Sequence, residues 1–265
     1  MKADNTAPIL TIDNLSYYYH TLTGETKALD NISFQVLPGE FVAIVGPSGC
    51  GKSTLLNIIA GQITGYSGRL MFTPEASSTF SRSSTLLPIG YMLQQDHLFH
   101  WRSIYRNVCL GLEINNAMTK DNIEKVLLLL KKYGLYDFKD KFPTQLSGGM
   151  RQRAALIRTL AMEPELLLLD EPFSALDYQT RLQVSSDIGH IIKENKKTAI
   201  LVTHNISEAI RLADKIIVLT KRPGRIKKIT EISLTVTENS PLDYRSAPEF
   251  NTYFNEIWED LTDEG

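Results

Sequence analysis

The octapeptide Gly46-Pro47-Ser48-Gly49-Cys50-Gly51-Lys52-Ser53 constrains the fold of this 265-residue chain more than any other segment. It fits the pattern G-x-x-x-x-G-K-[ST], between the apolar run 41–45 and an expected helix over 54–60. Glycines let the backbone curl so that successive N–H groups face phosphate oxygens, and the following helix N-terminus favours an anion. Lys52 can reach the terminal phosphates, and the Ser53 hydroxyl can ligate Mg²⁺. The motif therefore predicts a phosphate-binding loop.

Nearly continuous apolar runs are typical of strands that are covered on both faces of a parallel sheet. Four such runs occupy residues 41–45, 166–169, 198–202 and 215–219. Two earlier stretches, 11–19 and 28–36, alternate between apolar and polar residues and are expected to form half-buried strands. Helices are expected over 122–132 and 147–161, inside a segment between 91 and 163 whose character is helical. The pattern predicts a doubly wound α/β core with a helical insertion.

The apolar run 166–169 ends in two carboxylates, Asp170 and Glu171. Ligands of open α/β sheets bind at the carboxyl ends of the strands, so both side chains are expected at a site. Asp170 is expected to hold Mg²⁺ through a water molecule, and Glu171 is placed to orient and deprotonate an attacking water. Together with the phosphate-binding loop, the pair predicts hydrolysis of a nucleotide.

Composition excludes several other classes of protein. A net charge of −2 argues against an extended nucleic-acid surface, which needs a basic excess. No apolar run approaches the roughly 20 residues that cross a bilayer, and residues 1–10 show no secretory signal. Cys50 and Cys109 are too few for a disulfide framework. The composition predicts a soluble cytosolic protein, in which the Ser- and Thr-rich stretch 75–85 forms an exposed loop.

The segment L-S-G-G-M-R-Q-R over 146–153 precedes the acidic strand. Ser147 and the two glycines open a helix, whose free N–H groups and dipole suit an anion. In company with the phosphate-binding loop and the acidic pair, Ser147, Gly148 and Gly149 resemble the signature sequence of the ABC ATPases. The resemblance extends over nearly the whole chain, with all motifs in the order of that family.

The resemblance implies catalytic roles for three residues. Gln94 is similar to the Q-loop glutamine, which senses Mg²⁺ and joins the core to the helical subdomain. Glu171 would be the general base, and His204 matches the switch histidine that contacts the γ-phosphate. Ser53, Gln94 and Asp170 would hold Mg²⁺.

The resemblance also implies the ATP contacts. These would come from the whole phosphate-binding loop, from Thr54 behind it, and from an aromatic side chain that stacks on adenine. Tyr19 aligns best with this aromatic residue, and Tyr17 and Tyr18 are alternatives. In a head-to-tail dimer, residues 147–149 of one subunit, and its Asp177 in the D-loop, would complete the ATP site of the other.

The family implies a single ABC ATPase domain over 1–265, an α/β fold of the P-loop NTPase type. Its RecA-like core, with an N-terminal antiparallel β subdomain, is expected over 8–94 and 164–230. The inserted α-helical subdomain is expected over 95–163, and a C-terminal extension over 231–265 with a helix that ends near Leu261.

Three segments, 97–102, 150–153 and 222–226, are similar to the nitrate/sulfonate/taurine importer ATPases, although His100 stands where proline is usual. In that group an ATPase dimer, of identical or paralogous subunits, lies beneath membrane permease subunits on the cytoplasmic face of the cell membrane. An extracytoplasmic solute-binding protein supplies the solute, for which nitrate, sulfonates, taurine and pyrimidine-type vitamin precursors are the open alternatives. The resemblance implies an import ATPase without a nucleic-acid partner. An ABC ATPase that drives export or acts on a non-transport partner is the alternative.

Two surface features have more than one interpretation. Trp101 is a candidate for contact with the permease or for packing within the helical subdomain. The five basic residues of segment 221–228 suggest phospholipid or nucleic acid, but a solvated hairpin fits a slightly acidic chain better.

Overall fold

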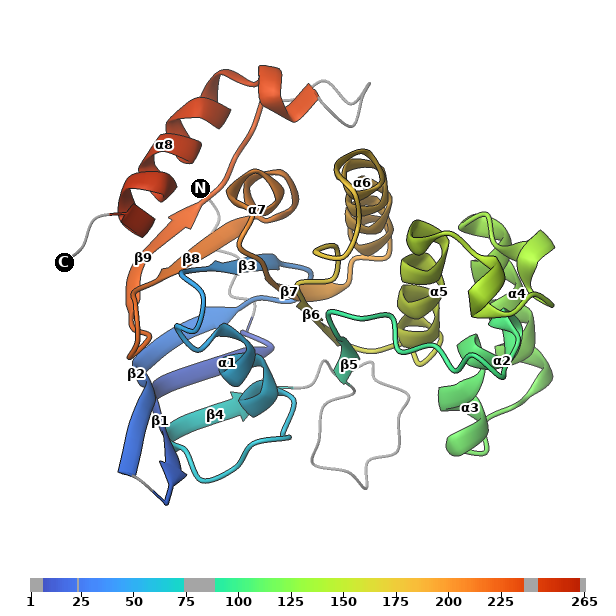
Figure 1. Cartoon of the computed structure of the whole chain (residues 1–265), viewed down its shortest axis with the longest axis horizontal. Coiled ribbons are helices and arrows are strands. Elements are labelled where there is room, and N and C mark those ends of the chain that lie inside the picture. The colour runs from blue at the N-terminus through green and yellow to red at the C-terminus, as the bar shows by residue number, and fades with distance from the viewer. Residues whose placement is uncertain (1–6, 23, 74–88, 236–242, 263–265) are drawn as a thin grey trace. The chain divides into compact units, whose positions relative to one another are not determined.

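The computed structural model describes residues 7–22, 24–73, 89–235 and 243–262, so the expected loop 75–85 lies outside the described residues. The chain divides into two compact units: unit 1 is Met1–Leu87 with Ile192–Gly265, and unit 2 is Pro88–Ile191. Figure 1 labels the helices and strands. Within the described ranges, none of the helices combines the length and the apolar character that a bilayer crossing requires.

An antiparallel sheet begins unit 1. It contains β1 (Leu10–Thr21), β2 (Gly24–Val36) and β4 (Ser67–Phe72) in the order β2-β1-β4. From Asp30 to Val36, β2 alternates between buried and exposed residues, because only one face of this sheet packs on the core. The sheet is the antiparallel β subdomain that the sequence predicts.

The remaining strands of unit 1 are β3 (Phe41–Val45), β7 (Thr198–Val202), β8 (Lys215–Leu219) and β9 (Ile226–Glu231), in the order β7-β3-β8-β9. β3 runs parallel to both β7 and β8, and β9 runs antiparallel to β8. Every residue of β3 and β7 is buried, which explains their continuous apolar sequences.

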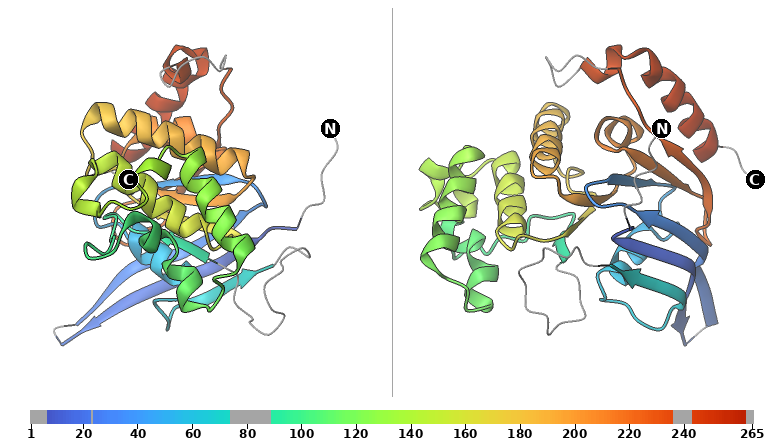
Figure 2. Two further views of the ribbon diagram at one scale, coloured as in Figure 1. Left: turned by 90° about the vertical axis from the view of Figure 1, so that its right-hand side faces the viewer. Right: turned by 180° about the vertical axis from the view of Figure 1, so that it is seen from behind.

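Three helices cover the strands of unit 1. α1 (Lys52–Ile59) contacts β7, and α7 (Ile206–Leu212) contacts β3. α8 (Pro248–Thr262), which follows a 3₁₀ turn at Asp243–Ser246, packs on α7 and β8. The right view of Figure 2 shows α8, in red, along the outer side of unit 1.

Unit 2 contains the predicted helical insertion. Its strands β5 (Ile89–Met92) and β6 (Leu166–Asp170) pair in parallel. Between them lie α2 (Ile104–Val108), α3 (Leu110–Ile114), α4 (Lys120–Lys132) and α5 (Gly148–Leu160), with 3₁₀ turns at Tyr136–Phe138 and Pro143–Gln145. α2, α3 and α4 each contact α5, and α6 (Tyr178–Glu194) follows β6. The predicted class, a P-loop NTPase core with a β subdomain and a helical insertion, is confirmed.

Local geometry moves two helix boundaries from their expected positions. α1 begins at Lys52 rather than Thr54, because Gly51 turns the chain with a φ of 108° directly before it. α4 begins at Lys120, where the Thr119 hydroxyl accepts a hydrogen bond from the backbone N–H of Asn122.

The structure also bears on the two surface features, Trp101 and the basic segment 221–228, that have more than one interpretation. Trp101 is 74% exposed and stacks on Phe99 with ring centroids 4.8 Å apart, so the helical subdomain does not bury it. The hairpin over 221–228 forms between β8 and β9, but its basic side chains are not only solvated: Lys228 pairs with Glu256 of α8, and Arg225 pairs with Asp30.

Candidate nucleotide-binding site

The phosphate-binding loop lies in unit 1, where β3 ends and α1 begins. The Lys52 ammonium folds back into the loop, and it donates hydrogen bonds to the carbonyl oxygens of Gly46 at 2.8 Å and Pro47 at 2.9 Å. Lys52 is only 6% exposed, and no carboxylate of the described residues forms an ion pair with it. Within the described part of unit 1, the loop therefore encloses a buried cation whose hydrogen-bond partners are two backbone carbonyl groups and the Cys50 sulfur.

Close packing requires glycine at two positions of this loop. A Cβ on Gly51 would lie 2.7 Å from Leu29 Cδ2 and 3.0 Å from the Ala28 carbonyl oxygen, and the φ of Gly51 is left-handed. A Cβ on Gly46 would lie 2.8 Å from Cys50 Sγ. Burial raises the pKa of the Cys50 thiol, so this side chain is a neutral packing group.

The predicted adenine-stacking residue lies beside this loop. The Tyr19 hydroxyl is 3.0 Å from the Thr54 hydroxyl at the start of α1. Tyr17 contacts the Tyr19 ring edge-on, at 5.0 Å between centroids, whereas the Tyr18 ring lies under the Lys27 ammonium. Tyr19 therefore contacts α1 through a hydrogen bond, and the residue is 39% exposed. Its stacking role stays a prediction.

His204 follows β7 and is exposed. Its neighbours hold the backbone on both sides: the Thr203 hydroxyl donates to the buried Glu208 carboxylate at 2.5 Å, and the Asn205 side chain caps α7 by accepting from Glu208 N–H at 3.2 Å. A histidine between two such anchors has a fixed backbone position, and the residue is exposed. The geometry suits a residue that meets a ligand.

In unit 2, Asp170 and Glu171 stand at the carboxyl end of β6, as the sequence predicts. Glu171 has a positive φ of 44°, an uncommon conformation for a non-glycine residue and one that is frequent at functional sites. Sequence reasoning missed their neighbour Tyr91 of β5. Burial raises the pKa of Tyr91, and the Asp170 carboxylate, which accepts its hydroxyl hydrogen bond, raises it further.

Gln94 lies close to the turn that follows Glu171. Its amide donates to the Ser174 hydroxyl at 3.2 Å, and that hydroxyl donates to the Glu171 carbonyl oxygen at 2.9 Å. Asp177 caps α6 by accepting from Thr180 N–H at 3.1 Å, and its hydrogen bonds to Thr180 hold the pKa of the carboxyl below its ordinary value. Unit 2 thus brings Gln94 and Glu171 together, although they are far apart in sequence.

The signature residues form the N-terminus of α5. Ser147 is the cap, and its hydroxyl accepts from Met150 N–H at 3.3 Å. A Cβ on Gly149 would lie 2.8 Å from Val184 Cγ2 and 2.9 Å from Thr180 Cγ2, so α5 and α6 approach closely there. The glycines therefore allow α5 and α6 to pack closely, and they also leave the backbone N–H groups of the first turn accessible.

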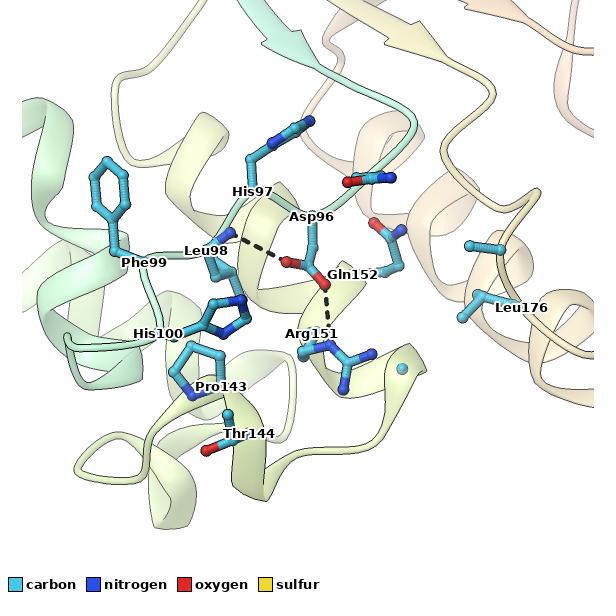
Figure 3. A pocket seen from close by; sticks show the side chains of 13 residues that line it. Asp96, His97, Leu98, Phe99, His100, Pro143, Thr144, Arg151, Gln152 and Leu176 are labelled. Atoms are coloured by element: carbon cyan, nitrogen blue, oxygen red, sulfur yellow. Dashed lines mark hydrogen bonds and ion pairs between the residues drawn. The ribbon is translucent and has the colours of Figure 1, made fainter.

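A pocket of about 580 Å³ opens in unit 2, next to the Gln94 segment. Figure 3 shows Asp96 at its wall, facing Arg151, with an ion pair of 3.0 Å between Asp96 Oδ2 and Arg151 Nε. His97, Phe99, His100 and Pro143 line other parts of this pocket. It combines apolar and charged walls, as a binding groove for a protein segment does.

Comparison with known protein families shows to which family the chain belongs. A family model described as ABC transporter matches residues 29–174, more than half of the chain. The chain belongs to the ABC transporter family. The matched part contains the phosphate-binding loop, Gln94, the signature residues and the acidic pair, whereas Tyr19, Asp177 and His204 lie outside it.

Three related ABC ATP-binding proteins align with 83% to 95% of this chain. It is 46% identical over 95% of both chains to the uncharacterized ABC transporter ATP-binding protein YtlC of Bacillus subtilis. It is 36% identical to the aliphatic sulfonates import ATP-binding protein SsuB of Bacillus thuringiensis, over 87% of this chain and 88% of that protein. It is 41% identical to the taurine import ATP-binding protein TauB of Roseobacter denitrificans, over 83% and 80%.

Solved structures agree with this family. The ATP-binding cassette MJ0796, in a dimeric post-hydrolysis state with ADP and Pi, aligns with a TM-score of 0.69 and 31% identity, over 84% of this chain and 99% of that one. This ABC protein is an ATP-binding subunit and an ATP hydrolase. The individual residue roles remain predictions.

Proposed function

We propose that the chain is the ATP-hydrolysing subunit of an ABC importer, with ATP bound at Gly46–Ser53. The observation that carries ATP binding is the Lys52 ammonium, which is buried in the loop and donates hydrogen bonds to the carbonyl oxygens of Gly46 and Pro47. A buried cation is costly without an opposite charge, and a phosphate group would supply one. Tyr19, next to Thr54, would stack on the adenine.

The donor set around the predicted metal position suits Mg²⁺. The Ser53 hydroxyl, the Asp170 carboxylate and the Gln94 amide are oxygen donors, and Mg²⁺ prefers one or two carboxylates together with substrate phosphates. When bound, Mg²⁺ would neutralise charge on the β- and γ-phosphates.

We assign the hydrolysis step to a base, Glu171, and to a residue that would bind the γ-phosphate, His204. Glu171 would accept a proton from the attacking water, and its turn is held by the Ser174 bridge to Gln94. His204, exposed after β7, would donate to the γ-phosphate. In a head-to-tail dimer of identical or paralogous subunits, Ser147–Gly149 and Asp177 would complete the ATP site of the partner subunit.

The unit 2 pocket supports a permease partner. Its walls carry Phe99, Pro143 and the Asp96–Arg151 ion pair, which suit a short amphipathic helix of a membrane subunit. Phe99 also stacks on the exposed Trp101, which extends the apolar surface. We place the chain at the cytoplasmic face of the membrane, held there by the permease, with a solute-binding protein on the opposite side.

Import of a sulfonate is the transport reaction that the relatives favour. The names of SsuB and TauB specify aliphatic sulfonates and taurine, and both relatives cover at least 83% of this chain. A sulfonate-type solute is therefore the first class to test, ahead of nitrate.

Glu171→Gln tests hydrolysis and import together. Loss of the general base should lower ATP turnover by about 100-fold or more while ATP binding stays within a factor of about two. In the source cell, the same substitution should abolish uptake of labelled taurine and alkanesulfonates. Glu163→Gln is the matched control, because Glu163 is an exposed carboxylate that pairs with Lys125.

The two readouts separate the parts of the proposal. Normal ATP turnover by the Glu171→Gln protein contradicts the assignment of the base. Loss of turnover with unchanged sulfonate uptake contradicts the solute class or the direction of transport, and leaves the ATPase assignment intact.

A further inference from the structure

The segment Arg222–Arg225, which we name the loop brace, lies against the phosphate-binding loop. It connects β8 to β9, within unit 1. Its Gly224 forms a parallel bridge to Leu29: Gly224 N–H donates to the Ala28 carbonyl at 2.9 Å, and Asp30 N–H donates to the Gly224 carbonyl at 2.9 Å. The backbone of the loop brace is therefore fixed to β2.

Gly224 also touches the loop itself. A Cβ at this position would lie 2.2 Å from the Cys50 carbonyl oxygen, so the backbone of the loop brace packs directly on the loop. Leu29, the bridge partner of Gly224, reaches the same loop from β2, since its Cδ2 lies 2.7 Å from the Cβ position of Gly51. Two separate segments thus support the outer side of the loop at adjacent residues.

Arg222 adds a charged contact to the loop. Its Nε donates to the Gly49 carbonyl oxygen at 3.1 Å. The N–H of the same peptide unit, that of Cys50, donates to the Pro47 carbonyl at 3.3 Å. Both polar groups of the 49–50 peptide are therefore bound, which fixes the orientation of that peptide just before the left-handed turn at Gly51.

Ion pairs at the other end hold the loop brace in place. Arg225 contacts the Asp30 carboxylate at 2.6 Å, and Lys27 pairs with the same carboxylate. Asp30 is only 5% exposed, so this pairing is better shielded than a surface ion pair. Arg222 therefore extends from a segment that is held by the backbone bridge of Gly224 to β2 and by the ion pair of Arg225 with Asp30.

We propose that Arg222 is a positioning residue for nucleotide phosphates and acts through the Gly49 carbonyl. Lys52 draws the carbonyls of Gly46 and Pro47 inward, and Arg222 holds the carbonyl of Gly49 from outside. A loop that is ordered before binding loses less entropy when phosphate binds. The inference rests on the proposed ATP site at Gly46–Ser53.

The expected effect is on affinity rather than on chemistry. Without the guanidinium, the Gly49 peptide has more freedom, so ATP and ADP should both bind about 3- to 10-fold more weakly, as for loss of one charge-assisted hydrogen bond. Both nucleotides should lose the same factor, because the loop would contact the phosphates that they share. KM for ATP should rise by that factor with kcat nearly unchanged.

The experiment compares four full-length variants: Arg222→Ala, Arg222→Lys, Arg69→Ala and Lys52→Ala. Calorimetry gives the Kd of ATP and of ADP, steady-state assays give KM and kcat, and thermal unfolding without nucleotide gives Tm. Arg222→Lys keeps a donor and should recover part of the affinity. Arg69→Ala removes the same charge from an exposed site of β4 and should bind like the wild type.

Each other outcome overturns one specific claim. Unchanged Kd values for Arg222→Ala, or a lower Tm alone, overturn the positioning role. A much larger loss for ATP than for ADP overturns action through Gly49, because it indicates a direct γ-phosphate contact. Unchanged binding by Lys52→Ala contradicts the proposed ATP site itself, and so separates that failure from failure of the Arg222 inference.

Discussion

At the scale of single residues, the candidate site depends on side chains that hold the reactive groups. Asp170 is one of these groups, and the Tyr91 hydroxyl from the paired strand β5 donates to its carboxylate. A neighbour that donates a hydrogen bond to a ligating carboxylate fixes its orientation and tunes metal affinity. Tyr91 would therefore act on Mg²⁺ through Asp170.

Tyr91→Phe removes this hydrogen bond and keeps the ring. We expect the Mg²⁺ concentration for half-maximal ATP hydrolysis to rise by about 10-fold, in the range for loss of an outer-shell contact. A Mg²⁺ titration of ATPase activity measures the shift, with Tyr136→Phe, an exposed tyrosine, as control. Superimposable titrations for Tyr91→Phe and wild type would contradict this role.

The ion pairs of Asp30 are expected to make the free energy of unfolding depend on pH in the acid range. Hydrogen bonds from Lys27 and then Arg225 hold the pKa of this carboxyl below its ordinary value in the folded chain. The folded state therefore binds fewer protons than the unfolded state, so the stabilisation is complete above about pH 4, the ordinary Asp range, and disappears as pH falls through the lower folded pKa.

Asp30→Asn removes this titration. We expect the free energy of unfolding of the wild type to fall more steeply below about pH 4 than that of the variant, because only the wild type loses a charged partner of Lys27 and Arg225. Urea unfolding at a series of pH values measures both curves. Parallel curves would show that Asp30 does not contribute to the acid response.

At the scale of elements, the same residues at the N-terminus of α5 pack against α6 and are predicted to contact the ATP of the partner subunit. Ser147 caps the helix, and Gly149 lets α6 approach. The two glycines differ: a Cβ on Gly148 would meet the flexible end of Leu176 at 3.1 Å, whereas a Cβ on Gly149 would meet two branched side chains below 3.0 Å. Gly149 is therefore the more restricted position.

Gly149→Ala should destabilise the chain by about 1–3 kcal/mol, the range for overpacking, because Val184 and Thr180 have little room to move. Gly148→Ala should cost less than half as much, since Leu176 can shift. Chemical denaturation of both variants measures the difference. Equal stability of the two variants would contradict the packing argument.

At the scale of the whole molecule, the resemblance implies that one chain is half of a functional assembly. The phosphate-binding loop of one subunit and Ser147–Gly149 of the other would enclose each ATP. ATP binding would then stabilise the dimer, and hydrolysis would release it.

Glu171→Gln should therefore form a stable dimer in ATP and Mg²⁺, with twice the mass of the 29.8 kDa chain, and revert to a monomer in ADP. Light scattering after size exclusion measures both masses. Adding Ser147→Ala to the Glu171→Gln chain should weaken the ATP dimer, because a hydroxyl that would contact the partner's ATP is lost. A mass that does not depend on nucleotide would contradict the head-to-tail arrangement.

Local sequence was sufficient for the fold class and for most of the buried core strands, whereas the roles of the site residues stay predictions. The glycines and Lys52 of the loop, the apolar runs of β3, β6 and β7, and the Ser147 cap are all short-range patterns with direct physical meaning. These patterns predicted the α/β core, the helical insertion and the ABC family. They did not predict the strands β4, β5 and β9 or the short helices α2 and α3. Each of these two helices has five residues, which span little more than one helical turn.

The tertiary structure decided the contacts between residues that are distant in the chain. Arg222 meets Gly49 across 173 positions, and Gln94 meets Ser174 across 80. Tyr91 and Asp170 meet only because β5 and β6 pair in parallel. The sequence by itself determined the phosphate-binding loop, because its chemistry is contained in consecutive residues. Which residues hold that loop and the acidic pair in position depended on strand order and register, which no local pattern encodes.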